Sequence, residues 1–308
     1  MTRAVVFGYH NVGVRCLRAL VDAGIDVPLV LTHEDSPAET IWFDSVARTA
    51  AEYGIASIAP VDPNAADIVE RVAACKPDFL FSFYYRSMLK GALLALPPRG
   101  ALNMHGSLLP KYRGRVPVNW AIIHGETETG ATLHYMIDKA DRGDIVAQRA
   151  VAILPDDTAR EVFDKVTAAA EQVLRGALPA LLAGNAPRIK QDAGTGTYYG
   201  GRKPEDGRID WSRSAIAIHN LVRAVAPPYP GAFTVVAGRA ARVLRTHVLD
   251  ARAAPMRGPS IAVENGHLVA RCGGGGSLSV LELEIDDAPV SAGAFAATHG
   301  TGEVPLGG

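Results

Sequence analysis

The sequence has few cysteines, and this scarcity excludes two kinds of site. Only three cysteines occur among its 308 residues, at Cys16, Cys75 and Cys272. Their odd number and wide separation exclude a disulfide framework and a CxxC metal site.

Net charge and long apolar runs are also missing. The 31 basic and 32 acidic side chains leave a net charge of -1, which gives no overall attraction to nucleic acid or to an anionic membrane. No segment approaches the roughly 18 apolar residues of a membrane-spanning helix, and no signal-peptide core follows the first residues. We therefore expect a soluble, cytoplasmic protein with no nucleic-acid or membrane partner.

The first half of the chain alternates short apolar runs with segments of helical period. The expected strands are Ala4–Phe7, Val27–Thr32, Phe79–Phe83, Ala101–Met104, Ala131–Met136 and Ile145–Val151. The expected helices are Asn11–Ala23, Phe43–Tyr53, Ile68–Cys75 and a long helix from Thr158 to about Leu182 that begins with a capping box. Such alternation is typical of βαβ units, so we predict an α/β fold: a Rossmann-like, mostly parallel sheet with helices on both faces.

The last third of the chain has a different pattern. Gln191–Arg208 contains five glycines and no apolar period, which is typical of a linker. One helix is expected, from the N-cap Ser214 to Val225, followed by short β-like runs and an Asn265-Gly266 hairpin turn. We predict two domains, residues 1–200 and 201–308, the second a smaller β-rich, OB-like barrel whose tail from Ser291 is poorly ordered.

Chemistry-bearing side chains follow several predicted strands. His10, His33, Tyr84 and His105 each come just after a strand end, and sites in such sheets lie outside the carboxyl ends of the strands. Asn103 and His105 lie on the same side of one strand. An amide can stabilise an oxyanion and an imidazole can exchange a proton. The alternative is a histidine that ends a strand before a solvated basic loop.

Asp141 lies between two predicted strands, within Lys139–Asp144. Aspartate and glycine are also common in ordinary polar turns, so a catalytic role requires this carboxylate to lie beside His105. The other histidines show no metal-ligand spacing and are expected to be structural or at the surface. Gly8 and Gly13 match no nucleotide-binding motif.

These residues together form a recognisable pattern. Asn103-x-His105, the segment Ser107–Gly114 and the later Asp141 resemble the signature of the folate-dependent formyltransferases. The resemblance implies that Asn103 stabilises the oxyanion, His105 is the general acid and base, and Asp141 tunes His105. It also implies 10-formyltetrahydrofolate as co-substrate, with no metal. The implied folate-binding residues are Ser87, Met88, Leu89, Arg115, Ile137, Asp138, Lys139, Ala140 and Asp141.

Further segments resemble one branch of that family, the ArnA-type enzymes of polymyxin resistance. They are Phe83–Arg86, Val116–Trp120, Gly125–Gly130, Asn220–Val225 and Pro230–Phe233. This resemblance implies formyl transfer to the 4-amine of UDP-4-amino-4-deoxy-L-arabinose, an amino-sugar nucleotide used in lipid A modification. Because the ArnA dehydrogenase half does not follow, a separate dehydrogenase is a candidate partner. The oligomeric state stays open.

Methionyl-tRNA formyltransferase is the main competing hypothesis, because it shares the length and both domains. That enzyme needs clustered cations for RNA phosphates, whereas Thr32–Ala56 holds five acidic residues and one arginine. Glycinamide ribonucleotide formyltransferases usually lack the second domain. Two further hypotheses stay open at this point: a non-catalytic folate- or nucleotide-binding regulator on the same fold, and a hydrolase acting on the formyl folate.

Overall fold

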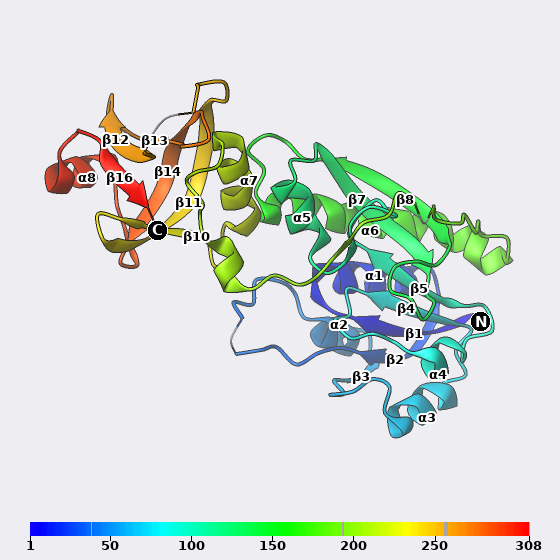
Figure 1. The fold of residues 1–308 in the computed structure, drawn as a ribbon. Coiled ribbons are helices and arrows are strands. Elements are labelled where there is room, and N and C mark those ends of the chain that lie inside the picture. Colours follow the sequence, from blue (N-terminus) through cyan, green and yellow to red (C-terminus); the bar gives the residue numbers. More distant parts are fainter. Residues whose placement is uncertain (38, 193, 256–257, 308) are drawn as a thin grey trace. The chain divides into compact units, whose positions relative to one another are not determined.

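The computed structural model describes residues 1–37, 39–192, 194–255 and 258–307 (Figure 1). The chain divides into two compact units. The first comprises Met1–Pro117, Glu128–Val151 and Phe163–Gly200, and the second Val118–Thr127, Ala152–Val162 and Gly201–Gly308. The motif residues Asn103, His105 and Asp141 therefore all belong to the first unit.

The first unit contains a seven-stranded sheet of order β3-β2-β1-β4-β5-β7-β8. Its strands are β1 (Arg3–Gly8), β2 (Asp26–Leu31), β3 (Ala56–Ile58), β4 (Phe79–Phe83), β5 (Ala101–His105), β7 (Glu128–Tyr135) and β8 (Ile145–Ala152). The strands from β3 to β5 are parallel, whereas β5 and β7 are antiparallel. The predicted mostly parallel sheet is confirmed.

Helices cover both faces of this sheet. They are α1 (His10–Asp22), α2 (Val46–Glu52), α3 (Ala66–Ala74), α4 (Gly91–Leu94) and α6 (Ala159–Ala183). Val72 of α3 and Leu93 of α4 share an apolar cluster with Val5 and Phe7 of β1. Residues alternate across a strand, so the neighbours of Val5 and Phe7 face the other side. Figure 1 shows α1 and α6 on that side, and Arg175 of α6 forms an ion pair with Asp22 of α1.

Two predicted helix starts can be checked against their caps. The capping box before α6 is confirmed, because Thr158 N donates to Glu161 Oε2 (2.7 Å) and Glu161 N donates to Thr158 Oγ1 (3.4 Å). The start predicted for α2 at Phe43 is wrong. Ser45 Oγ accepts a hydrogen bond from Arg48 N, and this N-cap places the first helical residue at Val46.

The second unit contains a closed antiparallel barrel of order β11-β10-β16-β12-β13-β14, closed by the pairing of β11 with β14. Its strands are β10 (Ala232–Val236), β11 (Arg239–Asp250), β12 (Ser260–Glu264), β13 (His267–Arg271), β14 (Ser277–Ile285) and β16 (Val304–Gly307), with the short β15 (Ala288–Pro289) beside β14. The remaining helices are α5 (Pro117–Ile123), the 3₁₀ turn η1 (Pro204–Gly207), α7 (Ala215–Val225) and α8 (Ala292–His299). The predicted OB-like barrel is confirmed.

The tail of the second unit differs from the prediction. Ser291 Oγ accepts from Ala294 N and caps α8, whose Phe295 is fully buried in the barrel core. The strand β16 then pairs with both β10 and β12. The expected poorly ordered tail is therefore wrong, because its small residues form a helix and its last strand fills a gap in the barrel.

Candidate active site

The strand β5 carries the first two candidate residues to the carboxyl end of the sheet. Asn103 and His105 are two residues apart and point to the same side of β5. The antiparallel neighbour β7 sets His134 opposite Asn103 and Thr132 opposite His105. Four polar residues of two strands therefore meet at the edge where the parallel strands end.

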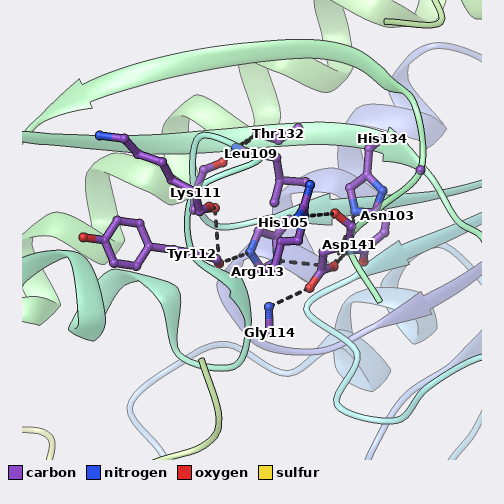
Figure 2. A network of polar contacts seen from close by, with 12 residues as sticks. Asn103, His105, Leu109, Lys111, Tyr112, Arg113, Gly114, Thr132, His134 and Asp141 are labelled. Carbon is purple, nitrogen blue, oxygen red and sulfur yellow. Dashed lines mark hydrogen bonds and ion pairs between the residues drawn. The ribbon is translucent and has the colours of Figure 1, made fainter. Parts of the chain in front are cut away.

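Asp141 reaches this group from the loop between β7 and β8. Its Oδ1 lies 3.6 Å from His105 Nδ1, 3.5 Å from Asn103 Nδ2 and 3.5 Å from His134 Nε2. Its Oδ2 accepts a hydrogen bond of 2.9 Å from Gly114 N. Figure 2 shows the four side chains directed toward one another. The structure thus brings together all three residues of the predicted catalytic set.

Each imidazole is held by a backbone carbonyl. His105 Nε2–H donates to Tyr112 O at 2.7 Å, and His134 Nδ1–H donates to Tyr135 O at 2.8 Å. Asn103 Nδ2 lies 3.2 Å from His134 Nε2. Because a carbonyl can only accept, Nε2 of a neutral His134 is the acceptor for the Asn103 amide. A protonated His134 instead presents a second donor to Asp141.

Sequence reasoning missed the part played by His134, for which a structural or surface role was expected. The ring is 1% exposed and contacts both Asn103 and Asp141. The sequence predicted a strand over Ala131–Met136, but it gave no sign that this strand pairs with β5 and sets His134 opposite Asn103.

The environment of Asp141 keeps its carboxyl ionised. Burial acts to raise the pKa of Asp141, but His105, the hydrogen bonding of His134 and the Gly114 N–H outweigh burial. The pKa of Asp141 consequently lies far below its ordinary value. The site therefore holds a permanent negative charge beside two imidazoles at neutral pH.

The loop after His105 is fixed by hydrogen bonds to side chains of β7 and β8. Thr132 Oγ1 donates to Ser107 O at 2.6 Å and accepts from Leu109 N at 3.2 Å. Gln148 Nε2 donates to Leu109 O at 2.8 Å. A Cβ on Gly106 would collide with Tyr84 Oη, so the Tyr84 ring would have to move to admit any other residue there. These contacts hold Tyr112 and Gly114 where they can bond His105 and Asp141.

The predicted folate-binding residues lie on the loop after β4, on the loop between β7 and β8 and, for Arg115, on the loop after β5. Asn64 Nδ2 donates to Met88 O and Lys90 N donates to Asn64 Oδ1, so one side chain fixes the loop after β4. A Cβ added to Gly91 would lie 3.8 Å from Asp138 Oδ1, so the loop after β4 lies beside residues 137–141. The remaining predicted residues divide by exposure: Leu89 is buried, Ser87 and Ala140 are half-buried, and Met88, Ile137, Lys139 and Arg115 are exposed.

The other residues predicted at this rim also gather there. The rings of His10 and Phe43 are stacked with centroids 3.9 Å apart, and those of His33 and Tyr85 at 4.1 Å. His33 Nε2 accepts a hydrogen bond from Arg86 N. Burial, together with the Arg86 charge, lowers the pKa of His33 to about 4. His33 is therefore neutral and serves as a hydrogen-bond acceptor.

Metal sites and membrane spans are both absent from the part of the chain that the structure describes. Within those ranges, no group of three or more His, Cys, Asp or Glu side chains is arranged to hold a metal ion. Among the same residues, no helix is both long and apolar enough to cross a bilayer. All three cysteines are free.

Comparison with protein families identifies the family to which this chain belongs. Residues 2–178 match the model described as formyl transferase, and residues 202–300 match the model of the formyl transferase C-terminal domain. The chain belongs to the formyl transferase family. The prediction that the protein is a formyltransferase is thereby confirmed, and its candidate site lies within the part that matches the catalytic model.

Solved formyltransferases share the fold. An N-formyltransferase from Helicobacter canadensis, solved with folinic acid and dTDP-3-aminofucose, has a TM-score of 0.69 at 18% identity over 91% of this chain and 99% of its own. WlaRD, a sugar 3N-formyltransferase solved with dTDP and 5-N-formyl-THF, has a TM-score of 0.69 at 17% identity over 93% and 98%. Glycinamide ribonucleotide transformylase 1 from Symbiobacterium toebii covers only 62% of this chain, at TM-score 0.53 and 22% identity. The two sugar enzymes thus match the fold along nearly the whole chain.

Proposed function

We propose that this enzyme transfers a formyl group from 10-formyltetrahydrofolate to the 4-amine of a sugar nucleotide, most specifically UDP-4-amino-4-deoxy-L-arabinose. The observation that carries the reaction class is the convergence of Asn103, His105 and Asp141 at one end of the sheet in a formyl transferase chain. The ArnA-like segments of the sequence and the sugar nucleotides bound by proteins of the same fold support the acceptor class.

The chemistry requires charge stabilisation and one proton relay. The neutral acceptor amine attacks the formyl carbon, and the bond from that carbon to the folate nitrogen breaks. Asn103 Nδ2 is a donor for the negative charge that develops on the formyl oxygen, an effect of about 3–4 kcal/mol when the donor is preorganised. His105 takes the proton from the attacking amine and returns one to the leaving nitrogen, worth roughly 10²–10⁴ in rate. Asp141 holds the imidazole in place.

The two neighbouring loops fit a folate. A pterin needs an apolar surface and backbone donors and acceptors at its edge. The exposed side chains of Met88 and Ile137 offer apolar surface on adjacent loops, and Asn64 fixes the backbone beside Met88. We assign Ser87, Met88, Leu89 and residues 137–141 to the folate, with Arg115 as a cation for its acidic tail.

The segment after β2 supports a small acceptor over tRNA. Three of its acidic side chains are bonded to other parts of the first unit: Asp35 accepts from Tyr9 Oη at 2.8 Å, Glu39 pairs with Arg86 and Glu52 pairs with Arg18. A surface that binds an RNA acceptor stem needs free cations. Here Glu39 and Glu52 pair with Arg86 and Arg18, two arginines from other parts of the first unit.

Competing acceptors are the direct test of the acceptor class. Purified protein is given 10-formyltetrahydrofolate with UDP-4-amino-4-deoxy-L-arabinose, with dTDP-linked amino sugars or with charged initiator tRNA, and formylated product is measured by mass spectrometry. We expect the UDP sugar to have the highest kcat/KM. Faster formylation of the tRNA would overturn the proposal of a sugar-nucleotide acceptor. Release of formate without any acceptor would indicate a hydrolase.

Two substitutions test the site itself. Asn103→Ala and His105→Ala are each expected to abolish measurable turnover, because each removes an effect of about 10² or more in rate. Circular dichroism and thermal unfolding check that both variants are folded. Normal rates in both variants would end the assignment.

A further inference from the structure

The glycine-rich segment after α6, predicted to be a linker, runs along both catalytic loops. Its strand β9 (Tyr198–Tyr199) pairs in parallel with β6 (Arg113–Gly114) in the loop that follows His105. Arg113 N donates to Thr197 O and Arg115 N donates to Tyr199 O, both at 3.0 Å. Thr197, Tyr198 and Tyr199 therefore belong to the first unit and contact the loop that positions His105.

Gln191 contacts the other catalytic loop. Its Nε2 donates to Asp141 O at 2.9 Å and to Gly143 O at 2.8 Å. Its Oε1 accepts from Arg113 NH2 at 2.8 Å, and Arg113 Nε donates to Asp141 O at 3.2 Å. The side chain of Arg113 is almost fully buried. One amide thus connects the backbone of Asp141 to the loop after His105.

The backbone at Asp141 needs such support. Its φ of 54° lies in the left-handed region, which is unfavourable for a residue other than glycine. Two side chains donate to its carbonyl, so the peptide cannot rotate without losing both hydrogen bonds. Since the carboxylate direction follows from that backbone conformation, Gln191 fixes where Oδ1 points.

Thr197 acts on the other side of the site. Its Oγ1 accepts a hydrogen bond of 2.8 Å from Tyr112 N. Tyr112 also has a left-handed φ, 57°, and its carbonyl is the acceptor for His105 Nε2–H. A shift of the Tyr112 peptide therefore moves the imidazole.

We infer that Gln191 and Thr197 are positioning residues for formyl transfer, Gln191 through Asp141 and Thr197 through the Tyr112 carbonyl and His105. This inference rests on the proposed roles of Asp141 and His105. The segment between the two family matches thereby contributes to the reaction, because it holds the two catalytic loops in fixed positions relative to each other.

The main experiment measures coupling between Gln191 and Asp141. Gln191→Ala is compared with Gln172→Ala, which removes an exposed glutamine of α6, in the full-length enzyme with 10-formyltetrahydrofolate and the preferred amino-sugar nucleotide. We expect Gln191→Ala to lower kcat about 10–100-fold, as a misplacement of about 1 Å does, with KM for both substrates little changed. In an Asp141→Asn background the same substitution is expected to lower kcat less than about twofold, because the two residues act as one unit.

Two outcomes would overturn the inference while leaving the proposed function intact: an unchanged kcat in Gln191→Ala, or losses in the double variant that multiply. Wild-type turnover in Asp141→Asn alone would instead overturn the proposed role of Asp141, and the inference with it. The two failures are therefore distinguishable.

Conservative variants separate positioning from folding. Gln191→Glu keeps an acceptor for Arg113 but loses both donors to the 141–143 backbone, so we expect it to lose kcat as Gln191→Ala does. Thr197→Val removes the acceptor for Tyr112 N at nearly constant size, whereas Thr197→Ser keeps the hydroxyl and is expected to recover most of the activity. Wild-type kcat in Gln191→Glu, or equal activity of the two Thr197 variants, would contradict the inference.

Discussion

Each unit of the protein contains an aspartate between two histidines, yet the two groups differ in what surrounds them. In the first unit Asp141 lies 3.6 Å from His105 and 3.5 Å from His134. In the second unit Asp156 lies 3.6 Å from His219 and 3.0 Å from His247. The side chain of Asp141 is 13% exposed and that of Asp156 is 46% exposed. Residue types and distances alone therefore do not distinguish the two groups.

The ring partners show what the second group does. His219 Nε2–H donates to Pro155 O and its Nδ1 contacts Thr246 Oγ1, both at 2.9 Å. Burial lowers the pKa of His219 and keeps the ring neutral. The ring thus joins α7 to β11 and to the segment before α6. Oδ1 of Asp141 lies beside an amide and two imidazoles, an arrangement suited to catalysis. Asp156 is half-exposed and lies beside a ring whose two nitrogens are both hydrogen-bonded, an arrangement suited to holding elements together.

The largest difference between the two groups is expected when each aspartate is neutralised. Asp141→Asn is expected to lower kcat on the order of 10²–10³-fold, because the positioned charge beside His105 is lost. Asp156→Asn is the matched control and is expected to retain kcat within about twofold, since substitutions at half-exposed sites have small effects. Steady-state assays of both variants decide the point. Equal losses would show that the two groups do not differ in function.

Replacing one buried histidine in each group tests whether the two groups also differ in the role of their histidines. His134→Leu removes the group that orients the Asn103 amide and is expected to lower kcat about 10–100-fold, as loss of a supporting hydrogen bond does at other sites. His219→Leu is expected to leave kcat unchanged. Both substitutions leave buried polar groups unpaired and are expected to lower the free energy of unfolding by about 1–3 kcal/mol. Urea unfolding and steady-state kinetics of both variants test this. A loss of kcat in His219→Leu without a loss in His134→Leu would show that the second group, and not the first, supports catalysis.

The smallest expected effect is on the pH dependence of stability. The pKa of Asp141 is lower in the folded state than its ordinary value of about 3.9 in the unfolded chain. Its contribution to stability is therefore complete above about pH 5 and falls as the pH drops through the unfolded-state value toward the folded-state pKa.

Urea unfolding of the wild type and of Asp141→Asn, at pH 7 and at pH 3.5, measures this effect. We expect the stability advantage of the wild type to shrink by about 1 kcal/mol between these pH values. The same comparison with Asp156→Asn is expected to show a smaller change, because solvent screens that side chain. An advantage that grows on acidification would contradict the lowered pKa of Asp141.

Much of the fold could be predicted from local patterns. Phe79–Phe83 is a continuous apolar run of strand length, and β4 has the same bounds. The hairpin turn at Asn265-Gly266 is confirmed by φ values of 49° and 78°. Asn103 and His105 could be paired because residues two apart on a strand share a face. These predictions needed only neighbours in the sequence.

The missed residues depend on partners that are distant in the sequence. His134 contacts Asn103 because of the antiparallel register of β5 and β7, and a slip of one residue would turn it to the other face. Gln191 lies at the start of a glycine-rich run, where local composition indicates a linker. Nothing local shows that its amide reaches the backbone of Asp141. Both omissions arise from tertiary contacts, which single-sequence patterns do not encode.

The course of the chain after α6 also bears on how such enzymes can be recombined. The first family match ends at residue 178 and the second begins at residue 202, so Gln191 and Thr197 lie in neither. A chimera joined at residue 178 would combine the catalytic loops of one parent with the supporting amide and hydroxyl of another. A crossover placed after Gly200 keeps the catalytic loops and their supporting residues from the same parent, so that junction is the better one for exchanging the Gly201–Gly308 part of the second unit.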